Sequence, residues 1–426
     1  MIDAVWEHDF YKDCIPNFSN NLSKPRHRWY EFKEGYSDAF VSRAINHYEN
    51  FTGLISGVIL DRFSGSGTTP LTGIQHGYKA VAVEVNPFMS FISRTKTKSY
   101  MEDLDSLERE LKAIIDARPS EIESKLEGVS TFSPTETNSK WLFNKSVLRG
   151  YEALRKAIKE YCAEEHQDFF ALALYSAIMD CCNARRDGKC LRYKKNWKTM
   201  GYSSIELRTL FIQYSNTILK DLTEVPLKGA EAQIINSDSR TALKGMDSGY
   251  VNIITFSPPY LNSFDYSDVY RPELFLGEYV DSNETLREIR SKTLRSHVQY
   301  AWNDDTSCSS SWVAEIVSNI KKRESSLWNK NIPAMIHNYF TDMESVLNEC
   351  YRVAASNATM WFIVSTSAYA GIEIPVDLLL ADLATKCGWE LQSVNALRNL
   401  RTSSQCIDSD VRKVRLRESM IACCKR

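Results

Sequence analysis

The chain has 426 residues, 43% of them hydrophobic and 25% charged, and its formal net charge is −2. This composition excludes a disordered or fibrous chain and is typical of a globular protein with two or more domains. The small net charge excludes a global field that attracts nucleic acid, so local basic patches would have to hold a polyanionic partner. No apolar run approaches the roughly 20 residues that span a membrane, and the N-terminus lacks the basic-then-apolar order of a secretion signal. We therefore expect a cytoplasmic protein without a membrane partner.

The eleven cysteines form no C-x-x-C pair. Cys181-Cys182 and Cys423-Cys424 are adjacent pairs, which are a poor arrangement for one tetrahedral zinc site. We expect reduced cysteines in the core and no bound metal.

A strand, a glycine-rich loop and a helix form the first unit of the chain. Residues 57–63 (GVILDRF) are an apolar strand pattern, followed by the loop SGSGTT and the helical pattern PLTGIQHGY. Residues 79–87 (KAVAVEVNP) are a second buried strand pattern with the acidic Glu84 near its end. This order is the opening of a doubly wound nucleotide-binding sheet of parallel strands covered on both faces.

The pattern changes over residues 101–231. Apolar residues recur there at spacings of three and four with few glycines, which predicts helices. Strand patterns return at AQIIN, VNIITF, ATMWFIVSTS and SMIACCK, and a polar, charged stretch separates the second of these from the third. The predicted fold is α/β, with a Rossmann-like catalytic domain built from residues 1–100 and 232–426. Residues 101–231 form a helical insertion that is a candidate for DNA contact, and residues 280–335 are a candidate target-recognition segment.

The glycine-rich loop predicts a cofactor site. Its glycines allow close backbone approach, and the N-terminus of the following helix offers unpaired N–H groups to an anionic group. A P-loop would need a lysine where Thr68 follows Gly67, and the dinucleotide pattern would need a glycine at Pro70, so a triphosphate or a standard dinucleotide is disfavoured. Glu84, at the end of the next strand, is placed to accept both ribose hydroxyls of an adenosine-containing cofactor.

The motifs DRFSGSGTT, AVEVNP and SPPY resemble the signatures of the S-adenosylmethionine-dependent DNA amino-methyltransferases. In that family the catalytic tetrapeptide is (D/N/S)PP(Y/F/W), and its serine form is typical of cytosine-N4 methylation. The resemblance covers about 22–98 and 232–426, and Arg62 stands where the family usually has proline. It implies that Glu84 binds the ribose, that Asn86 shapes the wall beside it and that Asp238 accepts a hydrogen bond from the adenine amino group. The residues that would hold the methionine end of S-adenosyl-L-methionine are Asp61, Phe63, Ser64, Gly65, Ser66, Gly67, Thr68 and Thr69.

The tetrapeptide Ser257-Pro258-Pro259-Tyr260 carries the chemistry. An exocyclic amine of a base is a poor nucleophile because its lone pair is delocalised into the ring. The Ser257 hydroxyl oxygen and the Pro258 carbonyl oxygen would each accept one N–H and hold the lone pair toward a sulfonium methyl, so positioning rather than a strong base drives an in-line displacement. The prolines Pro258 and Pro259 keep the backbone rigid, and Tyr260 would stack on a base flipped out of its helix. A stiff strand-ending turn is the alternative for this peptide on its own.

A basic stretch, residues 183–198, predicts nucleic-acid contact because cations that bind phosphate alternate with aromatic residues for stacking. A solvated basic loop is the alternative. A second candidate lies at residues 287–295, with Arg287, Arg290, Lys292 and Arg295. Tyr266 is the best of the aromatic residues downstream of SPPY for lining the flipped base, although Phe264, Tyr266 and Tyr270 are equally compatible with a core. The cations of the first stretch are Arg185, Arg186, Lys189, Arg192, Lys194, Lys195 and Lys198.

The leading hypothesis is a cytosine-N4 DNA methyltransferase of the restriction–modification kind, with DNA and a cognate restriction endonuclease as candidate partners. The alternatives are adenine-N6 methylation, RNA base methylation and a non-catalytic nucleic-acid-binding subunit. Cytosine-C5 chemistry needs a Pro-Cys nucleophile, and the chain contains no Pro-Cys dipeptide.

Overall fold

The computed structural model describes residues 3–6, 17–99, 104–129, 131–187, 190–227, 231–400 and 416–426. At its centre is an eight-stranded sheet in the order β1–β11–β12–β8–β7–β2–β3–β6. Strands β7, β2, β3 and β6 run parallel to their neighbours and to β8, whereas β12 is antiparallel to both β8 and β11. The strands of this sheet are β1 (Val5–Trp6), β2 (Val58–Asp61), β3 (Lys79–Glu84), β6 (Ala232–Asn236), β7 (Val251–Phe256), β8 (Ala354–Ser365), β11 (Glu390–Asn399) and β12 (Arg417–Cys424).

Strand β2 is the point at which the sheet's connection order reverses. It pairs with β3 on one side and with β7 on the other. Ligands of open α/β sheets bind at such a switch point, outside the carboxyl ends of the strands. The loops that follow β2 and β7 are the glycine-rich loop and SPPY, so the topology places the two motifs side by side.

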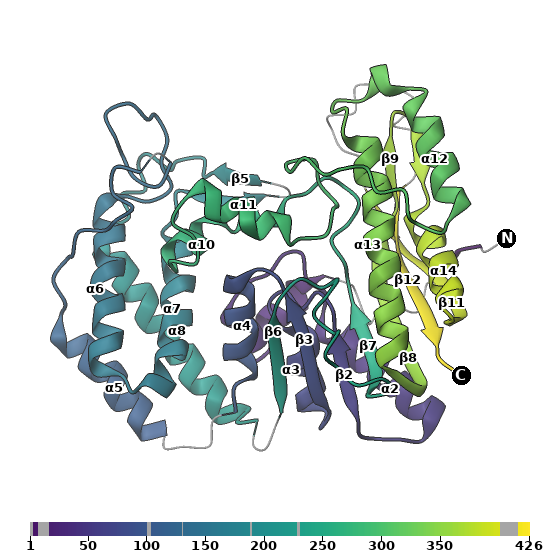
Figure 1. Ribbon diagram of the computed structural model, residues 1–426. Helices are drawn as coiled ribbons and strands as arrows, with labels where there is room; N and C mark the ends of the chain where they lie inside the picture. Colours follow the sequence, from purple (N-terminus) through teal and green to yellow (C-terminus); the bar gives the residue numbers. More distant parts are fainter. Residues whose placement is uncertain are drawn as a thin grey trace.

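Helices cover both faces of the sheet (Figure 1). Because successive residues of a strand point to opposite faces, Ile59 packs in the core under α2 and α3, while Leu60 packs in the core under α13 and α14. The predicted doubly wound α/β fold is therefore confirmed, with the addition of antiparallel strands at one edge. The helices on the sheet are α2 (Asp38–Thr52), α3 (Thr68–Gln75), α4 (Pro87–Thr97), α12 (Ser311–Lys321), α13 (Ile332–Val353) and α14 (Val376–Lys386).

The described residues of the stretch predicted as a helical insertion contain four helices and one β-hairpin. Figure 1 shows the helices at the left of the sheet, beside α4, and the hairpin above them next to α11. Leu111 of α5, Phe170 of α7 and Phe211 of α8 share a core with Phe88 of α4 and Leu274 of α10. The insertion therefore packs on the catalytic domain. Its elements are α5 (Leu104–Ala117), α6 (Lys145–Tyr161), α7 (Glu164–Asp180), β4 (Ala184–Asp187), β5 (Cys190–Tyr193) and α8 (Ser204–Glu224).

Short elements complete the described structure. Three helices lie between β7 and α12, in or just before the segment predicted for target recognition. Among the described residues, no helix is long and apolar enough to cross a membrane. The remaining elements are η1 (Phe18–Ser23), η2 (His27–Trp29), α9 (Tyr266–Val269), α10 (Arg271–Leu276), α11 (Asn283–Ser291), η3 (Glu324–Ser326), β9 (Ser367–Tyr369) and β10 (Ile372–Ile374).

Candidate active site

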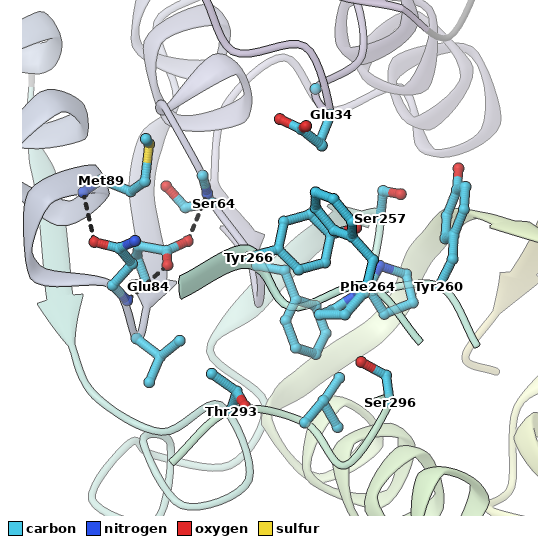
Figure 2. Close-up of a pocket in the computed structure, with 18 of the residues that line it drawn as sticks. Glu34, Ser64, Glu84, Met89, Ser257, Tyr260, Phe264, Tyr266, Thr293 and Ser296 are labelled. Atoms are coloured by element: carbon cyan, nitrogen blue, oxygen red, sulfur yellow. Dashed lines mark hydrogen bonds between the residues drawn. The ribbon is translucent and has the colours of Figure 1, made fainter. Parts of the chain in front are cut away.

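A cavity of about 400 Å³ opens at the carboxyl edge of the sheet and joins the two motifs. Figure 2 shows Glu84 on one side of it and Ser257 with Tyr260 on the other. The walls include apolar side chains such as Val83, Val85 and Met89. Such an elongated space, apolar with a few polar groups, is typical of a cofactor site. The predicted residues that line it are Phe63, Ser64, Gly65, Thr68, Glu84, Asn86, Ser257, Pro258, Pro259, Tyr260 and Tyr266.

The Glu84 carboxylate ties the end of β3 to the glycine-rich loop. It accepts hydrogen bonds from the backbone N–H of Gly65 at 2.7 Å and of Asn86 at 2.8 Å. Burial raises the pKa of Glu84 to about 7, although these two hydrogen bonds favour the ionised form. Glu84 also lines the cavity, so its position is compatible with the predicted role.

Asp61 lies beneath the loop and does not line the cavity. Its carboxylate accepts from the Tyr36 hydroxyl at 2.7 Å and from the Phe63 backbone N–H at 2.9 Å. Burial raises its pKa to about 6. The Thr69 hydroxyl also contacts the Tyr36 hydroxyl and, at 3.1 Å, the hydroxyl of Thr255 on β7. Asp61 and Thr69 therefore brace the loop against the strands that flank it.

Gly65 is a position that only glycine fits. Its φ is +50°, and an added Cβ would stand 2.5 Å from the ring of Phe32. The Phe32 ring in turn stacks on Tyr270 at 5.7 Å between centroids, and both rings line the cavity. The loop thus presents bare backbone to the cavity beside an aromatic side chain, as a closely approaching cofactor requires.

Hydrogen bonds orient the Ser257 and Tyr260 side chains of SPPY, the two to which the resemblance assigns a role. The Ser257 hydroxyl donates to the Ile363 carbonyl of β8 at 3.2 Å. The hydroxyl proton is therefore engaged, and the lone pairs of the oxygen remain as acceptors. The Tyr260 hydroxyl donates to Glu418 of β12 at 2.8 Å, and Glu418 is paired with Arg398 at 2.7 Å. This chain of contacts holds the Tyr260 ring at the cavity wall.

Aromatic and acidic side chains face SPPY. Phe264 and Tyr266 make an edge-to-face pair at 4.4 Å, and Figure 2 shows both rings beside Ser257 with Glu34 above them. The Glu34 carboxylate accepts from the Tyr270 hydroxyl at 2.8 Å, and burial raises its pKa. Sequence reasoning did not single out Glu34 or Phe32.

Several predicted cofactor residues lie outside the cavity lining, among them Ser66, Gly67 and Asp238. Asp238 is held by Arg240 at 2.6 Å, and its neighbour Ser239 lines the cavity instead. The role of Asp238 stays a prediction. Arg62, the departure from the family pattern, is buried, lines the cavity and finds no hydrogen-bond partner for its guanidinium within the described structure.

The cations of the basic stretch fall into two groups: exposed side chains, and side chains that bind other residues of the protein. Arg185, Arg192, Lys195 and Lys198 are exposed. The assignment of Arg186 to phosphate contact needs correction, because its side chain is buried in an ion pair with Glu273. Lys194 donates to the Asp180 carbonyl at 2.8 Å and is half-buried. Lys189 lies outside the described residues.

The aromatic residues of the same stretch pack against other rings of the protein and are not available at its surface. Trp197 is buried edge-to-face on Trp141 at 4.7 Å, and Tyr193 packs against Trp197 at 5.2 Å. Base stacking by these rings is therefore disfavoured. In the second basic candidate, Arg290 pairs with Asp265 at 2.7 Å and Arg295 pairs with Asp342 at 2.7 Å, so these two cations stabilise loops of the catalytic domain.

Within the described ranges no cluster of three or more His, Cys, Asp or Glu side chains is arranged to hold a metal ion. The nine cysteines that fall in those ranges are free.

Comparison with known proteins finds relatives that share one name, type II methyltransferase. No family model matches the chain. It is 25% identical to the type II methyltransferase M.BsoBI of Geobacillus stearothermophilus over 98% of its own length and 89% of the relative's. It is also 25% identical to the type II methyltransferase M.AvaI of a Nostoc species, over 93% of its length and 85% of the relative's. The solved structure of the rRNA methyltransferase aviRa from Streptomyces viridochromogenes matches 95% of the chain and 92% of its own at 9% identity, but its TM-score of 0.31 is too low to support a conclusion.

The cavity fits a methyl donor built from adenosine and methionine, since an acid for the ribose stands at one end and SPPY at the other. The predicted resemblance is borne out: along almost its entire length the chain is similar to type II methyltransferases, and S-adenosyl-L-methionine is the methyl donor that this similarity and the cavity support.

Proposed function

We propose that this protein methylates the exocyclic N4 of cytosine in DNA, as the modification enzyme of a restriction–modification system. The observation that carries the proposal is the Ser257 hydroxyl at the switch point, one strand away from the cofactor loop. The relatives support it, because type II methyltransferases act in restriction–modification systems. The serine form of the tetrapeptide supports cytosine as the target.

The side chains would act by holding the amine. When bound, S-adenosyl-L-methionine supplies the electrophilic methyl group. The Ser257 oxygen, its own proton engaged by Ile363, and the Pro258 carbonyl accept the two N–H groups of the target amine. The amine nitrogen is thereby biased toward tetrahedral geometry, with its lone pair directed at the methyl carbon. The bound cofactor would give its methyl group to the nitrogen that Ser257 and Pro258 hold, and the surplus proton would leave the nitrogen for solvent.

The aromatic side chains in and around SPPY suit a flipped base. Tyr260, Tyr266 and Phe264 offer ring faces and edges for stacking, and base flipping gives access to an amine that is paired inside a duplex. Adenine N6 would be held by the same acceptors, and this alternative rests on the shared chemistry of the two amines.

Methyl transfer from labelled S-adenosyl-L-methionine tests the acceptor class. Duplex DNA, single-stranded DNA and RNA of matched length are offered in turn to the wild-type protein. We expect duplex DNA to be the preferred acceptor. Preference for RNA would contradict the proposal, as would the absence of transfer to every nucleic acid.

A further inference from the structure

The β4–β5 hairpin of the insertion has two chemically different faces. Arg185 on β4 lies directly opposite Arg192 on β5, and both are exposed. Like charges directly opposite one another weaken a strand pair. Within the described ranges Arg192 has an acidic partner, Asp187 at 2.7 Å, and Arg185 has none. The opposed arginines therefore contribute little to the stability of the hairpin, and an anionic ligand on the outer face explains their placement better. The neighbouring Arg186 points the other way, as alternation along a strand requires.

The inner face of the hairpin is locked to the catalytic domain through Arg186. Its guanidinium forms an ion pair with the fully buried Glu273 of α10 and donates to the Tyr30 hydroxyl at 3.0 Å. It also lies over the Tyr270 ring, 4.3 Å from the centroid. The Lys33 ammonium donates to the Arg186 carbonyl at 2.8 Å. Buried charges are costly unless they are paired, so this arrangement allows little movement between hairpin and domain.

One residue that Arg186 contacts, Tyr270, lines the cavity together with two of its own neighbours. Tyr270, under the guanidinium, donates to Glu34 at 2.8 Å and stacks on Phe32. We define the recognition wall as Phe32, Glu34 and Tyr270, all of which line the cavity. A continuous path of contacts therefore leads from the exposed arginines of the hairpin to the space beside Ser257.

We propose that Arg186 is a positioning residue that holds the target-base pocket in shape from the inner face of the hairpin, while the outer face of the same hairpin contacts DNA. This proposal rests on the proposed function. The helical insertion then has a specific role: it supports the recognition wall from behind through Arg186, and its exposed Arg185 and Arg192 contact phosphates. Arg186 acts through Tyr270 and Glu34 and does not touch the base.

Substitutions at two neighbouring residues test the outer and inner faces of the hairpin separately. Arg185→Ala removes an outer cation, and we expect the KM for DNA to rise at least threefold while kcat changes less than twofold. Arg186→Met removes the inner cation, and we expect kcat to fall at least tenfold while the Kd for DNA stays within threefold of wild type. The opposite KM-against-kcat split from adjacent residues of one strand is the signature of two separate roles, DNA contact on the outer face and pocket positioning on the inner face.

Arg186→Met leaves the buried Glu273 without its cation, with only the Tyr30 hydroxyl as a partner among the described residues, and this change alone destabilises the fold. The double variant Arg186→Met/Glu273→Gln removes both charges and serves as the folding control, checked by its thermal melting. We expect the folded double variant to retain DNA affinity and the low kcat, and Arg186→Lys to recover part of the rate. A folded double variant with wild-type kcat would overturn the proposal, and so would a loss confined to DNA affinity. If wild-type protein transfers no methyl group to DNA, the proposed function fails, and that failure is seen before any variant is compared.

Discussion

The Glu84 carboxylate accepts a hydrogen bond from the backbone N–H of Gly65 at 2.7 Å, so the acid after β3 and the loop after β2 are one unit. A ligand that binds Glu84 is thereby placed against the backbone of the loop. Changes at either residue should alter cofactor binding, each for a different physical reason.

Protonation of Glu84 should weaken cofactor binding. Burial raises its pKa to about 7, and a protonated carboxyl offers fewer acceptor sites to the ribose hydroxyls. We expect the Kd for S-adenosyl-L-methionine, measured by calorimetry, to rise as the pH falls through about 7. The effect on stability has the opposite sign: a raised pKa favours the fold below the usual value of 4.5, and this contribution is lost as the pH rises through about 7.

Glu84→Gln provides the control for this pH dependence. The variant should bind the cofactor more weakly at pH 8 and show a flat profile between pH 6 and 8. An unchanged slope in the variant would assign the titration to a different group.

Gly65→Ala should disrupt the cofactor loop. The new Cβ would stand 2.5 Å from Phe32, and the residue would keep an unfavourable φ of +50°. We expect cofactor affinity to fall at least tenfold. Gly77→Ala is the matched control, because Gly77 has a φ of +85° with no atom within 4 Å of the added Cβ. It pays only the backbone cost of about 1 kcal/mol in the free energy of unfolding, so equal losses of affinity in both variants would refute the role of the contact with Phe32.

Ser257→Ala should separate binding from chemistry. It removes an acceptor for the target amine but leaves the Glu84 end of the cavity unchanged. We expect methyl transfer to fall at least tenfold, with the cofactor Kd within about twofold of wild type, and the same split for Tyr260→Ala. Ser326→Ala, at an exposed position in η3, is the control with full activity. Wild-type rates in both pocket variants would remove SPPY from the mechanism.

Removal of exposed cations from the basic stretch should reduce the salt dependence of DNA binding. Each lost phosphate contact lowers the slope of log K against log salt by about 0.9. We expect Lys195→Ala and Lys198→Ala to weaken binding uniformly across sequences, as measured by fluorescence anisotropy over a salt series. Lys112→Ala, an exposed cation on α5, should have no effect. Equal slopes for all three variants would place the DNA elsewhere.

The cofactor half of the site was predictable because its residues follow strands in short, contiguous motifs. Asp61, Gly65 and Glu84 each stand at or just after the carboxyl end of a strand, where parallel topology brings them together. The continuous apolar patterns of β2 and β3 were readable as strands covered on both faces.

The recognition wall was not predictable in this way. Glu34 and Tyr270 are separated by 236 residues, and their contact depends on how α10 packs against the N-terminal segment. The direction of Arg186 depended on recognising a four-residue strand inside a stretch that read as a basic loop. Charge alone could not distinguish Arg186 from Arg185. The alternation of side chains between the two faces of β4 does distinguish them.

The central claim is that Ser257 and Pro258 hold a cytosine N4 amine of DNA. The most direct measurement is nucleoside mass spectrometry of duplex DNA methylated in vitro by the purified protein and digested to nucleosides. The account predicts N4-methylcytosine, absent when Ser257 is changed to alanine. N6-methyladenine as the sole product, or 5-methylcytosine, would contradict it.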